Sequence, residues 1–195
     1  MRDGTPSTGD VGQRLRGAGA LHRLGRAQEA QERLHEAARR LAEQDTPQSR
    51  LAELTVLNSL GSLLRQAGRP AEALDIHRRS ERICHAGIPG RTEELIVLYH
   101  AVARQQIGND LAALGRWHEA EPPLRQALAA FEEAQMPAWA EAARLDLGQV
   151  LTATGHREAR QTLLAAREAL TALRSPRQAE AAVALASLDE ATADT

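Results

Sequence analysis

The sequence predicts an all-α protein, a right-handed superhelical solenoid of about four antiparallel helical hairpins with a C-terminal capping helix. Residues that favour helices, namely Ala, Leu, Arg, Glu and Gln, dominate the chain throughout. Runs that alternate in the manner of strands are few, and aromatic residues make up only 2% of the chain. One short string of residues recurs along the chain, which is the signature of a repeat protein.

The recurring string ends one helix at a glycine and begins another a few residues later. Its four copies read LHRLGRAQEA, LRQAGRPAEA, LAALGRWHEA and LTATGHREAR. Their glycines are spaced by 43, 47 and 40 residues: Gly25, Gly68, Gly115 and Gly155. A leucine stands four residues before each glycine, and a small residue stands seven before it: Ala18, Gly61, Gly108 and Gly148. Agreement at three positions in four copies indicates a common structural unit.

Each unit is expected to form a helical hairpin. The small residue and the leucine three positions later share one face of the first helix, where a small side chain lets a second helix approach closely. The glycine ends that helix, because it adopts the left-handed backbone conformation at little cost. Pro70 suits the first turn of the following helix, since its missing N–H would have no partner there. Ala73 and Ala120, five residues beyond their glycines, are small enough to lie where the two helices cross.

The pattern places the hairpins in order along the chain. Residues 1–10 are rich in Gly, Ser, Thr, Pro and Asp and are expected to form a disordered tail before a single repeat domain over 11–193. The repeats span about 11–45, 48–87, 91–135 and 138–174, with helices at 11–24, 27–44, 48–67, 70–86, 91–114, 117–135, 138–154 and 157–173. A last helix over 176–192 has no partner and is expected to cap the array. Pro122 and Pro123 predict that the second helix of the third repeat starts nearer Pro122 than Trp117, or is kinked there.

These residues resemble the tetratricopeptide repeat. Its pattern matches the second repeat at Gly61, Leu64, Gly68 and Ala73, and the third at Gly108, Leu111, Gly115 and Ala120. The fourth repeat, which is one residue short in its turn, matches at Gly148, Leu151 and Gly155. The period is nearer to about 42 residues than to 34, and in this it is similar to an extended subclass seen in kinesin light chains and in the sensor arrays of bacterial regulators.

The resemblance implies a protein- or peptide-binding scaffold or sensor that acts in bacterial regulation and binds its partner in a concave groove. The alternative is a ligand-responsive transcriptional regulator fragment, separated from its DNA-binding or NTPase domain. By resemblance, the groove is lined by positions on the first helix of each repeat: Asn58, Ser62, Arg65, Gln66, Gln105, Asn109 and Gln149. Asn and Gln side chains both donate and accept hydrogen bonds, so they can hold the backbone of an extended peptide. Otherwise these residues are ordinary solvated helix positions.

Charge and composition narrow the choice of partners and the location. The formal net charge is −2, from 24 basic and 26 acidic residues, which argues against direct nucleic-acid binding and against a membrane-surface protein. No apolar run approaches the roughly 18 residues that a membrane-spanning helix needs, and the N-terminal residues lack the apolar core of a signal peptide. The single cysteine, Cys84, excludes an internal disulfide and fits a reducing compartment. The expected location is therefore the cytoplasm.

The sequence predicts neither catalysis nor a cofactor. The densest group of potential ligands is His77, Glu81 and Cys84, which share one face of a helix, with His85 pointing off that face. A zinc site needs three or four converging ligands, and no second pair with ligand spacing is nearby, so no metal site is expected. By the repeat register, His77 falls at a packing position. No phosphate-binding loop, serine elbow or flanked cysteine nucleophile is present, so the protein is not expected to be an enzyme.

Overall fold

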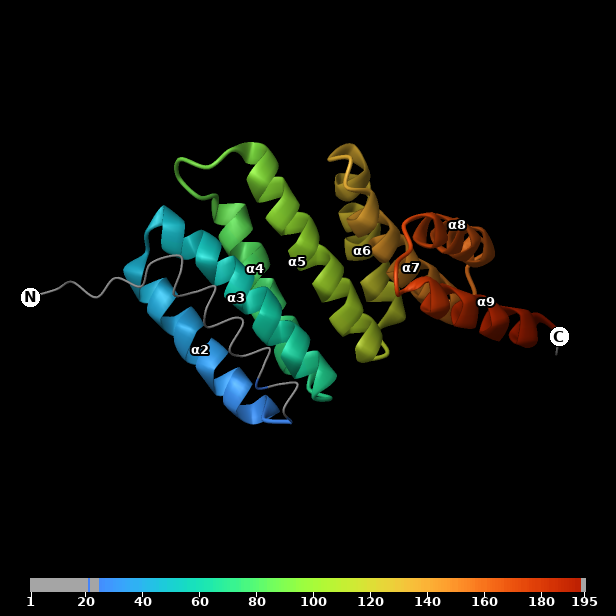
Figure 1. Cartoon of the computed structure of the whole chain (residues 1–195), viewed down its shortest axis with the longest axis horizontal. Helices are drawn as coiled ribbons and strands as arrows, with labels where there is room; N and C mark the ends of the chain where they lie inside the picture. The colour runs from blue at the N-terminus through green and yellow to red at the C-terminus, as the bar shows by residue number, and fades with distance from the viewer. Residues whose placement is uncertain (1–20, 22–24, 194–195) are drawn as a thin grey trace, which may run out of the picture. The chain divides into compact units, whose positions relative to one another are not determined.

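The protein is built from α-helices joined by short turns (Figure 1). The computed structural model describes residue 21 and residues 25–193, and within these residues it contains no strand. The helices are α2 (Ala27–Gln44), α3 (Pro47–Gln66), α4 (Pro70–Ala86), α5 (Glu93–Ala113), α6 (Trp117–Glu133), α7 (Pro137–Ala153), α8 (Ala159–Ala172) and α9 (Gln178–Ala193). Each begins and ends within two residues of its expected position, which confirms the all-α helical solenoid. The tail over 1–10 and most of the helix expected over 11–24 lie outside the described residues.

The chain divides into two compact units, residues 1–106 and 107–195, with the boundary inside α5. In the first unit, α3 packs against α2 and against α4, and Figure 1 shows α2 and α3 side by side. In the second unit, α7 packs against α6 and α8, and α9 packs against α8 and α7. Both cores consist mainly of leucine and alanine side chains. The single domain expected over 11–193 stays a prediction.

A glycine in the first helix of each described hairpin lies against a large side chain of the second helix. A Cβ atom placed on Gly108 in α5 would lie 2.5 Å from Leu124 Cγ and 3.2 Å from the backbone oxygen of Ala120, both in α6. Gly148 in α7 meets Leu163 in α8 in the same way, at 2.6 Å. These helices therefore pack at a distance that admits no side chain at the glycine, as the sequence predicted.

The first unit repeats this contact with a different partner. A Cβ atom on Gly61 in α3 would lie 2.4 Å from two ring atoms of His77 in α4, and His77 is completely buried. The partner follows its glycine by 16 residues here and in the next hairpin, but by 15 residues between Gly148 and Leu163. This confirms both the packing role of His77 and the missing residue in the fourth repeat.

The turn inside each hairpin is closed by the backbone. Gly68 adopts the left-handed conformation with a φ of 75°, and the N–H of Arg69 donates to the carbonyl oxygen of Leu64 at 2.9 Å. The turn between α6 and α7 closes in the same way without a glycine. There Gln135 has a φ of 53° and the N–H of Met136 donates to the Phe131 oxygen at 2.9 Å. A left-handed residue is therefore a requirement of the turn, whether or not glycine supplies it.

Helix α6 begins at Trp117 as in the expected range 117–135, so of the two effects expected from its prolines, the later start is wrong. The helix runs from Trp117 to Glu133 with Pro122 and Pro123 inside it, so it does not begin near Pro122. The two prolines withhold N–H groups from the carbonyls four residues earlier, which belong to His118 and Glu119. Both of those residues are exposed, so water can satisfy their oxygens. The exposure of these two residues therefore lowers the cost of the two prolines.

Replacing Gly108 by valine tests the close approach of α5 and α6. We expect Gly108→Val to lower the free energy of unfolding by about 2–4 kcal/mol, because the new side chain overlaps Leu124 and the α6 backbone. Chemical denaturation monitored by circular dichroism measures the change. Ala113→Val, at an exposed position of the same helix, is the control and should cost well under about 1 kcal/mol. Equal effects of the two substitutions would contradict the proposed packing.

Candidate functional site

The expected groove residues all lie on α3, α5 and α7, the first helices of their hairpins. Five belong to the first unit: Asn58, Ser62, Arg65, Gln66 and Gln105. Two belong to the second unit: Asn109 and Gln149. Gln66 and Gln149 are exposed, most of the others are half-buried, and Gln105 is buried with 4% of its surface accessible. The positions thus differ in how much each could offer to a ligand.

In the first unit, one of the expected groove residues, Arg65, links α3 to α5. Nη2 of Arg65 donates a hydrogen bond of 2.8 Å to Oε1 of Gln106. About two turns earlier on α3, Oδ1 of Asn58 is buried and has no hydrogen-bond partner within residues 25–193. A buried oxygen without a partner is costly and is rare in folded proteins. Asn58 is therefore the residue of this set with the clearest unmet capacity for a hydrogen bond.

In the second unit, Asp146 of α7 joins three elements. Its carboxylate is 5% exposed and accepts a bond of 2.9 Å from Nδ2 of Asn109 on α5. It also accepts a bond of 2.7 Å from Nη2 of Arg177, the residue before α9. Burial lowers the pKa of Arg177, but the charges and hydrogen bonds of Asp146 and Glu180 together more than offset this effect, so the pKa lies above its ordinary value. Asn109 thus lies on the predicted helix, but it already holds a protein carboxylate.

Asp146 was not predicted from the sequence. The only signal is a carboxylate inside the apolar string AARLDLGQVL, at a helix position that the repeat pattern makes buried. A buried carboxylate requires partners, so the residue could have been flagged. Its partners could not, because Arg177 is 31 residues away in the sequence.

A groove lies between α7 and α9 in the second unit, with a volume of about 540 Å³. The α7 helix contributes Gln149 and Thr152, and the α9 helix contributes Ala179, Glu180, Val183, Ala184 and Ser187. Val183 is 67% exposed, the highest value among the large hydrophobic residues of the described chain. The helix expected to cap the array thus presents an apolar side chain beside an amide of the preceding repeat.

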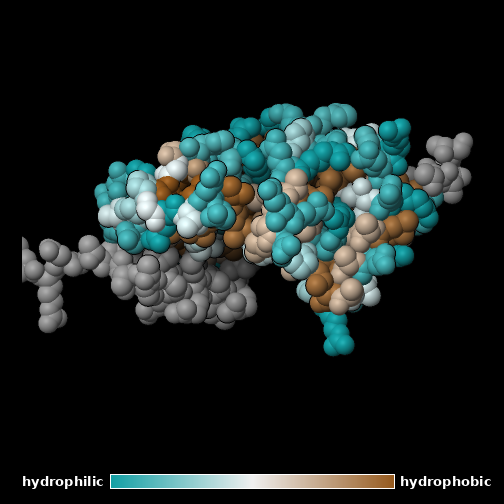
Figure 2. Space-filling model, turned by 90° about the horizontal axis from the view of Figure 1, so that it is seen from above, coloured by the Kyte–Doolittle hydropathy of each residue, from teal (hydrophilic) through white to brown (hydrophobic). Residues whose placement is uncertain are grey.

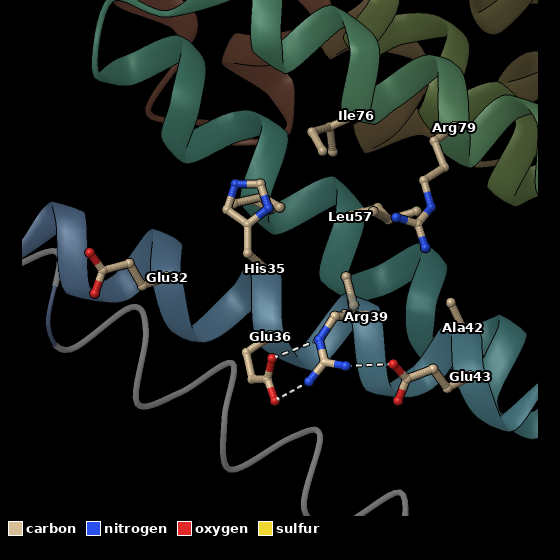
Figure 3. Close-up of a pocket in the computed structure, with 11 residues that line it drawn as sticks. Glu32, His35, Glu36, Arg39, Ala42, Glu43, Leu57, Ile76 and Arg79 are labelled. Carbon is tan, nitrogen blue, oxygen red and sulfur yellow. Dashed lines mark hydrogen bonds and ion pairs between the residues drawn. The ribbon is translucent and has the colours of Figure 1, made fainter.

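A second hollow, of about 700 Å³, lies over α2, α3 and α4 in the first unit (Figure 3). Its floor is closed by Leu57 and Leu60, which have no exposed surface. Arg39 on its rim bonds to Glu36 and Glu43, as the dashed lines in Figure 3 show. Arg40 and then Arg39 hold the pKa of Glu36 below its ordinary value. Glu36, Arg39 and Glu43 on this rim therefore pair with one another.

The group of ligand-like residues flagged in the sequence separates in the structure. His77 packs against Gly61, and Cys84 is buried in an apolar cluster with Leu54 and Ile88. Burial, followed by the charge of Glu81, raises the pKa of the Cys84 thiol to about 11, which makes it a poor nucleophile at neutral pH.

Glu81 instead faces residues of α5. Its Oε1 atom lies 3.5 Å from Nε2 of His100 and 3.6 Å from Nε of Arg104. The ring of His85 contacts that of His100 edge to face, with 4.4 Å between the ring centroids. Burial, Arg104 and His85 together hold the pKa of His100 below its ordinary value, against the opposing effect of Glu81. The sequence missed this arrangement because His100 belongs to the next repeat.

The other exposed apolar side chains of the described residues are scattered over the helices. The face seen in Figure 2 is largely hydrophilic, with hydrophobic residues interrupted by hydrophilic ones. The large hydrophobic residues that are exposed within the described chain are Val97, Trp117, Trp139, Leu164, Leu173 and Val183. Among the described helices, none combines the length and the apolar character needed to cross a bilayer.

Removing Arg177 tests whether Asp146 holds the last elements of the second unit together. We expect Arg177→Gln to lower the free energy of unfolding by about 1–3 kcal/mol, because it leaves a buried carboxylate with one fewer charged donor. Arg167→Gln, at an exposed position of α8, is the control and should have little effect. Urea denaturation of the wild type and of both variants measures the free energy of unfolding. An Arg177→Gln variant as stable as the Arg167→Gln control would contradict this role of Asp146.

Two family models match the sequence, both described as tetratricopeptide repeat, over residues 16–85 and 100–134. No functionally curated protein matches it. A crystal structure of nearly identical TPR-like repeats assigned to a kinesin light chain of Podosopora anserina superposes with a TM-score of 0.72 at 17% identity, covering 94% of this chain and 87% of that one. A crystal structure of the apo form of RapI superposes with a TM-score of 0.71 at 10% identity, covering 93% of this chain and 48% of RapI.

The structural likenesses, at such low identity, concern the fold alone. The two family matches together cover more than half of the chain and coincide with the hairpins described above. The chain belongs to the tetratricopeptide repeat family, whose members are generally scaffolds for protein interaction.

Proposed function

We propose that the protein binds a peptide, or an extended segment of a protein, in the groove between α7 and α9. The observation that carries the proposal is the exposed side chain of Val183 beside the free end of Gln149, in a groove of about 540 Å³. The residues expected on α3, with Asn58 foremost, form a second proposed contact face within the first unit. The protein is thus proposed to be a scaffold or sensor without catalytic activity.

The chemistry of the α7–α9 groove suits an extended chain. Val183 and Ala184 offer apolar surface for a hydrophobic side chain of the ligand. The Gln149 amide can donate to a backbone carbonyl and accept from a backbone N–H. At the end of the groove, Glu180 already bonds Arg177, so its charge is balanced within the protein. The groove therefore favours a ligand with an apolar anchor and a free backbone edge over a highly charged one.

The proposed cellular role rests on the family and on the charge of the chain. We infer a cytoplasmic protein of bacterial regulation that binds protein rather than nucleic acid, as its net charge of −2 suggests. The alternative remains a ligand-responsive transcriptional regulator fragment, separated from a DNA-binding or NTPase domain. Sequencing of the coding region on either side of this chain distinguishes the two.

Selection from a displayed library of random peptides tests the proposed groove. Peptides enriched on the wild-type chain should bind Val183→Asp and Gln149→Ala at least tenfold more weakly, as fluorescence anisotropy of the labelled peptides would show. Leu164→Asp introduces the same charge at an exposed leucine of α8 and is the matched control, which should bind as the wild type does. All three positions are exposed, so circular dichroism should show unchanged folding.

Three results would contradict the proposal. One is that repeated selection enriches no peptide. Another is that Val183→Asp and Leu164→Asp weaken binding equally, which would indicate a general effect of charge. The third is loss of binding with His35→Asp but not with Val183→Asp, which would move the site to the hollow over α2, α3 and α4.

A further inference from the structure

We propose that Glu81, His85 and His100 form a binding site for a transition-metal ion such as Zn²⁺, which would join α4 to α5 within the first unit. Glu81 and His85 come from α4, and His100 comes from α5. This site is separate from the proposed peptide groove, which lies in the second unit. It replaces the expectation, drawn from the sequence, that no metal site exists.

The geometry brings one ligand atom from each residue to a common point. The three atoms lie within 4.8 Å of one another. Glu81 and His85 are four residues apart on α4, a spacing that places two side chains on the same face of a helix. The His100 ring approaches from α5 and meets the His85 ring edge to face. Small side-chain rotations, of which those of the exposed His85 are the freest, would bring three ligands to bonding distance of one ion.

One of the proposed ligand atoms also has no hydrogen-bond partner among the described residues. Nε2 of His100 is buried and makes no hydrogen bond to any described residue. Glu81 Oε1, its nearest charged neighbour, is 3.5 Å away, which is too long for a good hydrogen bond. A buried nitrogen without a partner calls for an explanation, and a bound ion supplies one. His85 is exposed, so an ion could enter from solvent past its ring.

The ligand set indicates the class of ion. Two imidazole nitrogens and one carboxylate suit zinc and its neighbours in the first transition row better than Mg²⁺ or Ca²⁺, which prefer oxygen ligands. Three protein ligands leave one position of a zinc tetrahedron for water. Cys84 is not part of the set, because it is buried in the apolar cluster with Leu54 and Ile88.

Arg104 lowers the affinity of this site for a metal ion, and its removal therefore gives a second test of the proposal. Its Nε atom is buried 3.6 Å from Glu81 Oε1 and makes no hydrogen bond within the described chain. The guanidinium therefore repels a bound cation and competes with it for the carboxylate. Removing this charge should strengthen metal binding, whereas removing a ligand should weaken it. General destabilisation of the fold would weaken metal binding in both kinds of variant, so it would not produce these opposite effects.

Calorimetric titration of Zn²⁺ into the full chain, prepared without a histidine tag and freed of metal, tests the proposal. We expect one site per chain. His85→Gln and His100→Gln should each weaken binding at least tenfold, and Arg104→Gln should strengthen it several-fold. His118→Gln, an exposed histidine of α6, is the matched control and should leave binding unchanged. Zn²⁺ should also raise the unfolding temperature of the wild type and of His118→Gln, but not of His85→Gln.

The His85→Gln variant keeps the test decisive, because an exposed side chain can be changed without loss of the fold. The proposal is overturned if the wild-type chain takes up no Zn²⁺ at millimolar concentration. It is also overturned if the His85→Gln, His100→Gln double variant binds Zn²⁺ as tightly as the wild type. Equal weakening by His85→Gln and His118→Gln would likewise indicate unspecific binding to surface histidines.

Discussion

The contact between a glycine on one helix and a large side chain on the next sets the geometry of the described hairpins. At Gly108, the neighbouring atoms include Leu124 Cγ and a backbone oxygen of α6, so no small shift of a side-chain end could make room for a methyl group. Once the two helices meet at this distance, the apolar faces that remain must be covered by the adjacent hairpin. The polar faces of α3, α5 and α7, on which the proposed functions depend, follow from this packing.

The sequence predicted the helices well because each boundary has a local cause. The glycine of the recurring string ends one helix and the spacing to the next alanine begins another, so both ends were found within two residues. The later start of α6 that Pro122 and Pro123 suggested was wrong. The free-energy cost of a proline inside a helix favoured a later start of α6. Burial of Ala120 and Leu124 against the preceding helix nevertheless extends α6 over the prolines. Tertiary packing overrode a local preference here, and a single sequence does not reveal its strength.

The sites were less predictable, because a site depends on which helices face each other. The repeat register placed Gln149 and Asn109 on the first helices of their hairpins, α7 and α5, and Gln149 lines a groove. It did not show that Asn109 already bonds the buried Asp146. Glu81 was noted as a potential ligand, but with two partners on its own helix. The structure pairs it with His100, a residue that only the packing of α5 on α4 brings near.

A double-mutant cycle between Gly108 and Leu124 tests the central contact most directly. Gly108→Ala should destabilise the protein by overlap, and Leu124→Ala should destabilise it by leaving a cavity. In the double variant the new methyl group enters the vacated space, so denaturation should show it to be more stable than the sum of the two single effects implies, by about 1 kcal/mol or more. Additivity to within about 0.5 kcal/mol would contradict the account, because residues in contact should not behave independently.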